Sequence, residues 1–134
     1  MSSMIFIDSN IPMYLIGVEH PLRSKAEILL TKLIRSKRRL VTSAEVLQEI
    51  CHRYCAIGRK EFLQPAFDTV YGLVDQVFPV TPEDVNQAKV LLLGYQNISA
   101  RDALHAAMMR NLGIKEIFTF DSDFDRFSWI TRVS

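Results

Sequence analysis

Four acidic side chains stand where an α/β fold would bring them together. Asp8 follows the apolar run Ile5 to Ile7, and Asp121 follows a second apolar run late in the chain. Asp102 lies in the first turn of a predicted helix, and Glu49 lies about one and a half turns into another. Carboxylates within a few ångströms of each other repel unless a proton or a cation neutralises them. The set therefore predicts a site for a hard divalent cation, magnesium or manganese, of the kind that serves phosphoryl chemistry.

Three of these four acids also have a purely local interpretation. Asp8 alone fits a helix cap. Asp102 follows Ser99 at the spacing of a capping box, while Asp121 and the nearby Asp123 fit turn residues. The joint placement favours a shared site, because independent caps need not all fall at one edge of one sheet.

The helix after the second predicted strand offers two candidate glutamates. Glu45 follows Thr42 at capping-box spacing, and either Thr42 or Ser43 fits the N-cap of this helix. Glu49 lies on the margin of the apolar face of the same helix. We therefore assign Glu45 to the cap and Glu49 to the metal.

Short apolar strands alternate with helices along the whole chain. The predicted strands cover residues 5–7, 40–41, 76–80, 117–120 and 129–133. The predicted helices cover residues 11–17, 22–36, about 43–58, 59–74 with a first turn or a break at Pro65, 81–95 and 99–113. This alternation predicts an α/β fold, a three-layer α/β/α sandwich with a central parallel sheet. In such a fold the ligand crevice lies outside the carboxyl ends of the strands, which is where Asp8 and Asp121 would lie.

Composition fits one domain spanning residues 1–134, because 134 residues with 49% hydrophobic content can bury one sizeable core. The formal net charge of +1 neither demands nor excludes a nucleic-acid partner. Cys51 and Cys55 lie four residues apart in a helical pattern, which is typical of reduced thiols. With neither a signal peptide nor a membrane-length apolar stretch in the pattern, we expect a cytoplasmic protein without a membrane partner.

Four ordered motifs carry a family resemblance that covers nearly the whole chain. They are IDSN at residues 7–10, TSAEVLQE at 42–49, ISARDALHAA at 98–107 and TFDSDF at 119–124. In this order and spacing they resemble the PIN-domain ribonucleases, in particular the VapC-type toxins of toxin–antitoxin pairs.

The resemblance implies roles for particular residues. The metal-binding, catalytic acids would be Asp8, Glu49, Asp102 and Asp121, with Asp123 as a further ligand and with Asn10 and Thr119 as polar supports in the same pocket. It also implies a PIN-like fold, cleavage of RNA phosphodiester bonds with magnesium or manganese, a homodimer, and inhibition by a small antitoxin protein.

Further side chains have candidate roles at the rim of this site. Arg101, Arg53 and the basic cluster at residues 37–39 are candidates for contacts with RNA phosphates, although solvated surface charge is the alternative for each. Tyr14 is a candidate for stacking on an unpaired base. His105 lies one turn after Asp102, and we favour a core histidine over a donor in the pocket.

Other functional classes fit the sequence less well. Cys51, His52 and Cys55 lack a fourth zinc ligand, and Arg126 occupies the glycine position that a calcium loop after Asp121 would need. A receiver-type signalling domain would need paired aspartates after the first strand. The main alternative is a catalytically silent PIN-like module that binds RNA or a protein.

Overall fold

A five-stranded parallel sheet forms the centre of the computed structural model, which describes residues 4–133. Its strands are β1 (Met4–Ile7), β2 (Arg39–Ser43), β3 (Gln76–Phe78), β4 (Glu116–Phe118) and β5 (Thr131–Arg132). They lie in the order β3-β2-β1-β4-β5, and every neighbouring pair is parallel. β1 is therefore the central strand, and all carboxyl ends point to the same edge of the sheet.

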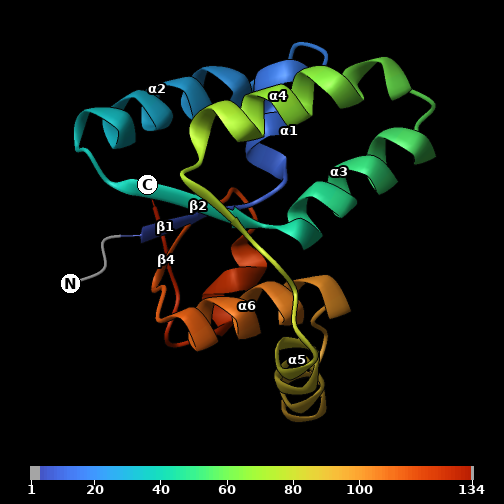
Figure 1. The fold of residues 1–134 in the computed structure, drawn as a ribbon, viewed down its shortest axis with the longest axis vertical. Helices are drawn as coiled ribbons and strands as arrows, with labels where there is room; N and C mark the ends of the chain where they lie inside the picture. Colours follow the sequence, from blue (N-terminus) through green and yellow to red (C-terminus); the bar gives the residue numbers. More distant parts are fainter. Residues whose placement is uncertain (1–3, 134) are drawn as a thin grey trace.

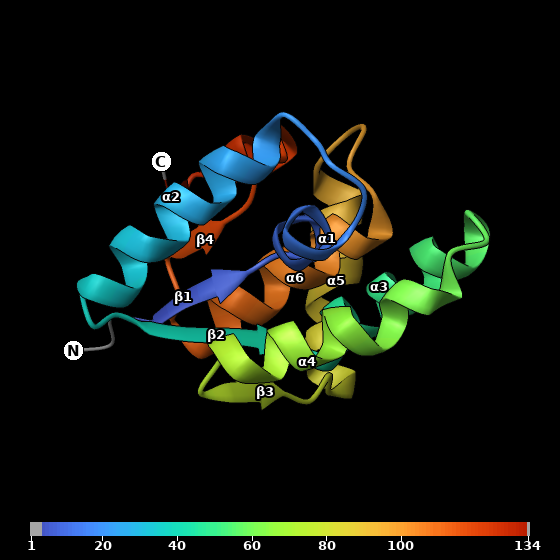
Figure 2. The ribbon, with the colours of Figure 1, turned by 90° about the horizontal axis from the view of Figure 1, so that it is seen from above.

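Helices cover both faces of this sheet. The α-helices are α1 (Asn10–Ile16), α2 (Leu22–Arg35), α3 (Ala44–Ala56), α4 (Leu63–Leu73), α5 (Pro82–Gly94) and α6 (Ala100–Leu112), and the short 3-10 helices are η1 (Lys60–Phe62) and η2 (Ser122–Arg126). Helices α1, α2 and α4 lie on one face, and α5 and α6 lie on the other (Figure 1). Seen from above, α4 crosses the β2 and β3 side of the sheet (Figure 2). The predicted three-layer α/β/α sandwich is confirmed.

The central strand is buried on both sides, as its unbroken apolar run predicts. Successive side chains of a strand point to opposite faces. Ile5 and Ile7 pack with Ile11 of α1 and Leu29 of α2, whereas Phe6 belongs to the core on the α5 and α6 side. All of these residues are at most 5% exposed. Asp8, the next residue, thus follows a central strand that is buried on both faces.

Local sequence signals set most helix ends. Thr81 and Asp84 form a complete capping box at the start of α5, with Pro82 in the first turn. Ser99 caps α6, and Gly113 ends it in the left-handed conformation with a φ of 72°. Gly17 is the C-cap of α1. These ends agree with the helices predicted at residues 11–17, 81–95 and 99–113.

The strand predicted at residues 117–120 ends earlier than expected, at Phe118. The Thr119 hydroxyl accepts a hydrogen bond of 3.0 Å from the backbone N–H of Asp121, which turns the chain out of the sheet and into η2. Asp121 therefore lies in the loop beyond the strand, not directly at its end. The predicted edge strands are also shorter than expected, since β3 ends at Phe78 and β5 spans only Thr131–Arg132.

The predicted helix at residues 59–74 is divided into η1 and α4. Pro65 lies in the first turn of α4, where its missing N–H needs no partner, so the first-turn alternative is the correct one. None of the helices in the described range 4–133 is long and apolar enough to cross a membrane.

Candidate active site

Asp8 directly follows the last residue of β1 and is 5% exposed. Its carboxylate accepts three hydrogen bonds. Its Oδ1 accepts from the backbone N–H of Ser9 at 2.8 Å, and its Oδ2 accepts from the Thr119 hydroxyl at 2.7 Å and from the Asn10 amide at 3.4 Å. Burial raises the pKa of Asp8, while the charge of His105 and the Thr119 hydrogen bond oppose the rise. Asn10 and Thr119, expected as polar supports, both contact this carboxylate.

Glu49 reaches the same place from α3. It is 7% exposed, and its Oε1 lies 3.2 Å from Nε2 of His105, while its Oε2 lies 3.6 Å from Nε of Arg101. Burial alone would raise the pKa of Glu49, but the hydrogen bond and charge of His105 outweigh burial and hold that pKa below its usual value. Asp8, Glu49 and His105 each offer a ligand atom within 4.8 Å of the others.

The predicted capping role of Glu45 is wrong. Ser43 is the N-cap of α3, and its hydroxyl accepts from the backbone N–H of Val46 at 3.4 Å. The Thr42 hydroxyl instead donates to the carbonyl oxygen of Ile7 at 2.7 Å, because Thr42 still belongs to β2 and faces β1. Of the two predicted N-caps, Ser43 is therefore the one that the helix uses, which puts Glu45 outside capping-box spacing, and Glu49 is the glutamate that lies with Asp8 and His105.

A second group of carboxylates comes from α6 and from η2. Asp102, Asp121 and Asp123 offer ligand atoms within 4.8 Å of one another. The Ser99 hydroxyl accepts from the backbone N–H of Asp102 at 3.0 Å, and the Asp121 carboxylate accepts from the N–H of Asp123 at 2.9 Å. The capping and turn contacts therefore exist, and they coexist with the shared cluster.

The charges of the two groups act on each other. Burial, followed by the charges of Asp121 and Asp8, raises the pKa of Asp102 to about 6. A carboxyl group with this pKa is an unfavourable place for a negative charge and a favourable place for a cation. The donor set consists of carboxylate oxygens, the ligands that magnesium and manganese prefer, so the residues fit such an ion.

His105 lies beneath the cluster. The imidazole is fully buried, packs 5.6 Å from the ring of Phe6, and places Nε2 3.9 Å from Oδ1 of Asp8 in addition to its contact with Glu49. Burial opposes a charged imidazole, but the hydrogen bond to Glu49 and the charge of Asp8 outweigh it and raise the pKa of His105. The sequence-based preference for a core histidine was incomplete, because this core residue also contacts two site acids. The sequence signal for these contacts was the position of His105, one turn of α6 after Asp102.

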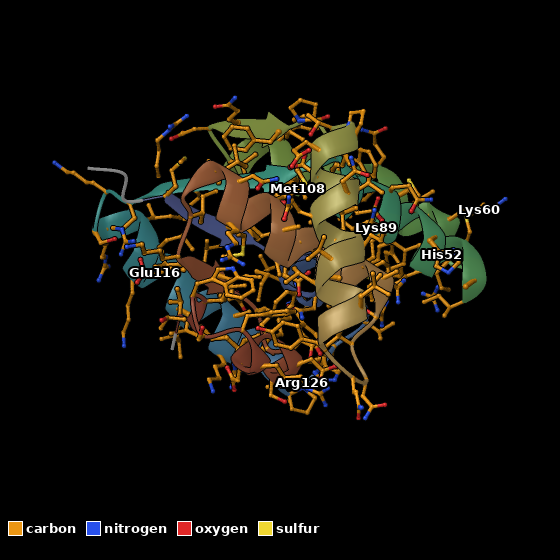
Figure 3. The ribbon with its side chains drawn as sticks, turned by 90° about the horizontal axis from the view of Figure 1, so that it is seen from below. His52, Lys60, Lys89, Met108, Glu116 and Arg126 are labelled. Atoms are coloured by element: carbon orange, nitrogen blue, oxygen red, sulfur yellow. The ribbon has the colours of Figure 1, made fainter. Side chains whose placement is uncertain are left out.

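The predicted basic contacts separate into two places. Arg101 contacts Glu49, and Arg53 lies one turn further along α3. The cluster at residues 37–39 lies at the amino end of β2, the opposite edge of the sheet, where Arg38 pairs with Glu116 and Arg39 pairs with Asp75. Figure 3 shows Glu116 on the side away from His52 and Lys60, which mark the far end of α3 and the segment that follows it. The cluster at residues 37–39 was therefore wrongly placed at the rim.

Neutralising Asp102 should stabilise the metal-free protein. A carboxyl group whose pKa is about 6 when folded and about 3.8 when unfolded loses folding stability as the pH rises between these two values. Asp102→Asn removes this loss, so at pH 7 in EDTA we expect a gain of about 1–2 kcal/mol after solvent screening, or roughly 3–6 °C in Tm. Calorimetry of both proteins tests this. Asp68→Asn, an exposed control on α4, should leave Tm unchanged, and a lower Tm for Asp102→Asn would contradict the electrostatic argument.

Together the fold and the site define an α/β/α protein with a cluster of acids, able to hold a cation, at the carboxyl edge of a parallel sheet. Comparison with known proteins makes this class specific. The family profile of the PIN domain matches residues 5–130. The chain belongs to the PIN-domain family, in its VapC branch.

Individual relatives agree over almost the full length. Ribonuclease VapC13 of Mycobacterium tuberculosis is 52% identical over 131 residues, which cover 98% of this chain and 100% of that protein. The crystal structure of VapC20 from the same species, described as a sarcin–ricin loop cleaving toxin, has a TM-score of 0.76 and 26% identity and covers 91% of this chain and 93% of that one. VapBC2 of Rickettsia felis, solved with a promoter DNA fragment, shares the fold with a TM-score of 0.69 at 16% identity and covers 96% of each chain.

Proposed function

We propose that this protein is a metal-dependent endoribonuclease and the toxin of a toxin–antitoxin pair. The observation that carries the proposal is the gathering of six ligand-bearing side chains at the carboxyl edge of the sheet, in a chain of the VapC branch. Asp8, Glu49, Asp102 and Asp121 hold magnesium or manganese, and Asp123 is a further ligand. A bound ion of this kind supplies an activated water and neutralises negative charge on a phosphate.

The side chains of the protein divide the remaining work. Asn10 and Thr119 hold the Asp8 carboxylate by hydrogen bonds, which fixes its direction before substrate arrives. The buried imidazole of His105 holds the Glu49 carboxylate in the same way, by a hydrogen bond. Arg101 compensates the charge of Glu49, and its half-exposed guanidinium lies where it could also bind an RNA phosphate.

The test is cleavage of a labelled, structured RNA by protein freed of any bound inhibitor. We expect cleavage with magnesium or manganese and none with EDTA. If calorimetry detects metal binding but several RNAs stay intact, the enzyme has a very narrow target. If neither metal binding nor cleavage is found, the catalytically silent RNA- or protein-binding module becomes the better assignment.

The partners follow from the same proposal. A small antitoxin protein would block the acidic edge, and the toxin would act in the cytoplasm, where its RNA substrates are.

We also propose a homodimer, supported by large apolar side chains that α5 leaves exposed, with Leu93 at 82% and Val85 at 52%. Light scattering should give twice the mass of the chain, and a monomer at micromolar concentration would contradict the dimer.

Magnesium binding should release protons in a pH-dependent way. With a pKa of about 6, Asp102 is about half protonated at pH 6 and about one-tenth protonated at pH 7, and an ion can bind only its ionised form. We expect Asp102 to contribute about half a proton to the release at pH 6. Calorimetry in two buffers of different ionisation enthalpy measures this number. The Asp102→Asn variant should lose that release, and an equal release from both proteins would contradict the role of Asp102.

A further inference from the structure

A cavity of about 230 Å³ lies between α1 and α3, beside the acidic cluster. Its walls include Met13 and Tyr14 of α1, Tyr54 of α3, and Phe62. Asn10 closes the end nearest the acids, because the same side chain donates to the Thr119 hydroxyl at 3.0 Å and to Asp8. The cavity and the proposed catalytic acids therefore share a wall.

Two polar atoms of residues that line this cavity have no partner among the described residues 4–133. The Tyr54 hydroxyl is buried without a hydrogen bond, and so is Oδ1 of Asn10. Buried polar groups are nearly always satisfied, and leaving one unpaired costs about 1–3 kcal/mol. Tyr54 as a whole is 2% exposed. Unpaired atoms at this depth indicate a ligand with its own donors and acceptors.

Gly17 keeps the space in front of the Tyr54 hydroxyl open. A Cβ at this position would lie 3.6 Å from the hydroxyl oxygen and 2.9 Å from the carbonyl oxygen of Met13. The second distance is shorter than real Cβ contacts, so a side chain here would force the backbone to shift. Glycine therefore puts no side chain between the cavity and the hydroxyl, which is closed to solvent in the free protein and which a ligand reaches by displacing neighbouring lining side chains.

Aromatic and cationic side chains define what kind of ligand fits. The Tyr14 ring packs against His20 with ring centroids 4.6 Å apart, and both line the cavity. Arg53 and Arg59 also belong to the lining. These walls match a ligand that has a flat ring, hydrogen-bonding atoms on the edge of that ring and an attached anion. Unpaired RNA bases bind to proteins through these same features. The volume is below the ~300–1,000 Å³ of pockets for drug-sized ligands, which suits a single base.

We propose that this cavity binds one unpaired nucleobase of the RNA substrate, next to the phosphate that is cut. Tyr54 and Asn10 contact the edge of the base, Tyr14 contacts its face, and Arg53 contacts a neighbouring phosphate. The inference rests on the proposed ribonuclease function and adds a source of base preference to it. Val18 and Ile57, exposed at 64% and 63%, give the cavity an apolar rim that would also suit a side chain of a protein partner. The buried polar atoms and the wall shared with the acids favour the base.

The test uses a set of short RNAs that differ only in the bases flanking the cut, with kcat and KM measured for each. Tyr54→Phe removes one hydroxyl, so we expect kcat/KM for the preferred base to fall about three- to tenfold, mainly through KM, and the ranking of bases to flatten. Its Tm should equal or exceed that of the parent, because the lost hydroxyl has no partner. Tyr71→Phe, on α4 and 60% exposed, is the matched control and should change neither value.

An unchanged ranking of bases in Tyr54→Phe would overturn the inference while leaving the ribonuclease intact. A variant with the parent's ranking but weaker inhibition by the antitoxin would assign the cavity to a protein side chain, which also overturns it. If the parent cuts none of the RNAs, the proposed function fails first, and the base pocket fails with it.

Discussion

Replacing Asp8 by asparagine should abolish metal-dependent RNA cleavage, with kcat falling by about 10³-fold or more. Asp8 is the acid that follows the central strand, and three hydrogen bonds hold it in one orientation. An amide lacks the negative charge that binds the cation and offers one oxygen where the carboxylate offers two. No other side chain of the cluster comes from β1, so none can take its position.

The fold of Asp8→Asn should survive. Asparagine has the size of aspartate, and its oxygen can still accept from the backbone N–H of Ser9. The Thr119 hydroxyl already accepts from the Asn10 amide and from the backbone N–H of Asp121, so of the hydrogen bonds of this hydroxyl the variant loses only the one that it donates to Asp8. Calorimetry should therefore show a cooperative transition within a few degrees of the parent. Asp68→Asn, the exposed control, should cleave RNA at the parent's rate, and retained cleavage by Asp8→Asn would refute the site.

The parts of the site that could be predicted from sequence depend on local pattern. The run Ile5 to Ile7 followed by Asp8 needs only a buried strand and its end, and the structure has both. Thr81 with Asp84, and Gly113 after α6, are complete signals within a few residues. In each case the interacting groups lie within one turn of chain, so no knowledge of the tertiary fold is required.

What the sequence could not determine depends on contacts between distant elements. The choice between Thr42 and Ser43 as the N-cap of α3 could not be made, because it depends on the hydrogen bond from the Thr42 hydroxyl to the carbonyl of Ile7, 35 residues away. The basic cluster at residues 37–39 is different, because the predicted helix at 22–36 and the predicted strand at 40–41 already implied that it lies at the amino edge of the sheet, where the structure has it. The contact between His105 and Glu49 joins two helices that are 56 residues apart in sequence. Helical periodicity gives the buried face of each helix, but it does not give the partner across the interface.

Replacing His105 by alanine should cost about 3–5 kcal/mol of folding stability and roughly 10–20 °C in Tm. The imidazole is fully buried between Glu49 and Asp8. Its removal leaves an empty volume in the core and two buried carboxylates without the group that compensates them. His52→Ala is the matched control, because this histidine is exposed on α3 and points outward (Figure 3).

The pH dependence separates the charge of His105 from its volume. The folded protein raises the pKa of His105 above the ordinary 6.5, so the ion pair contributes fully below that value and is lost as the pH rises through the folded-state pKa. The difference in free energy of unfolding between the parent and His105→Ala should therefore become smaller as the pH rises. At alkaline pH, only the cost of the empty volume should remain. His105→Gln keeps an N–H donor for Glu49 and should recover part of the loss at every pH. Denaturant unfolding at several pH values measures all three proteins. A gap that does not change with pH would show that His105 acts by packing alone, and the acids would then be held by Thr119, Asn10 and Arg101 without its charge.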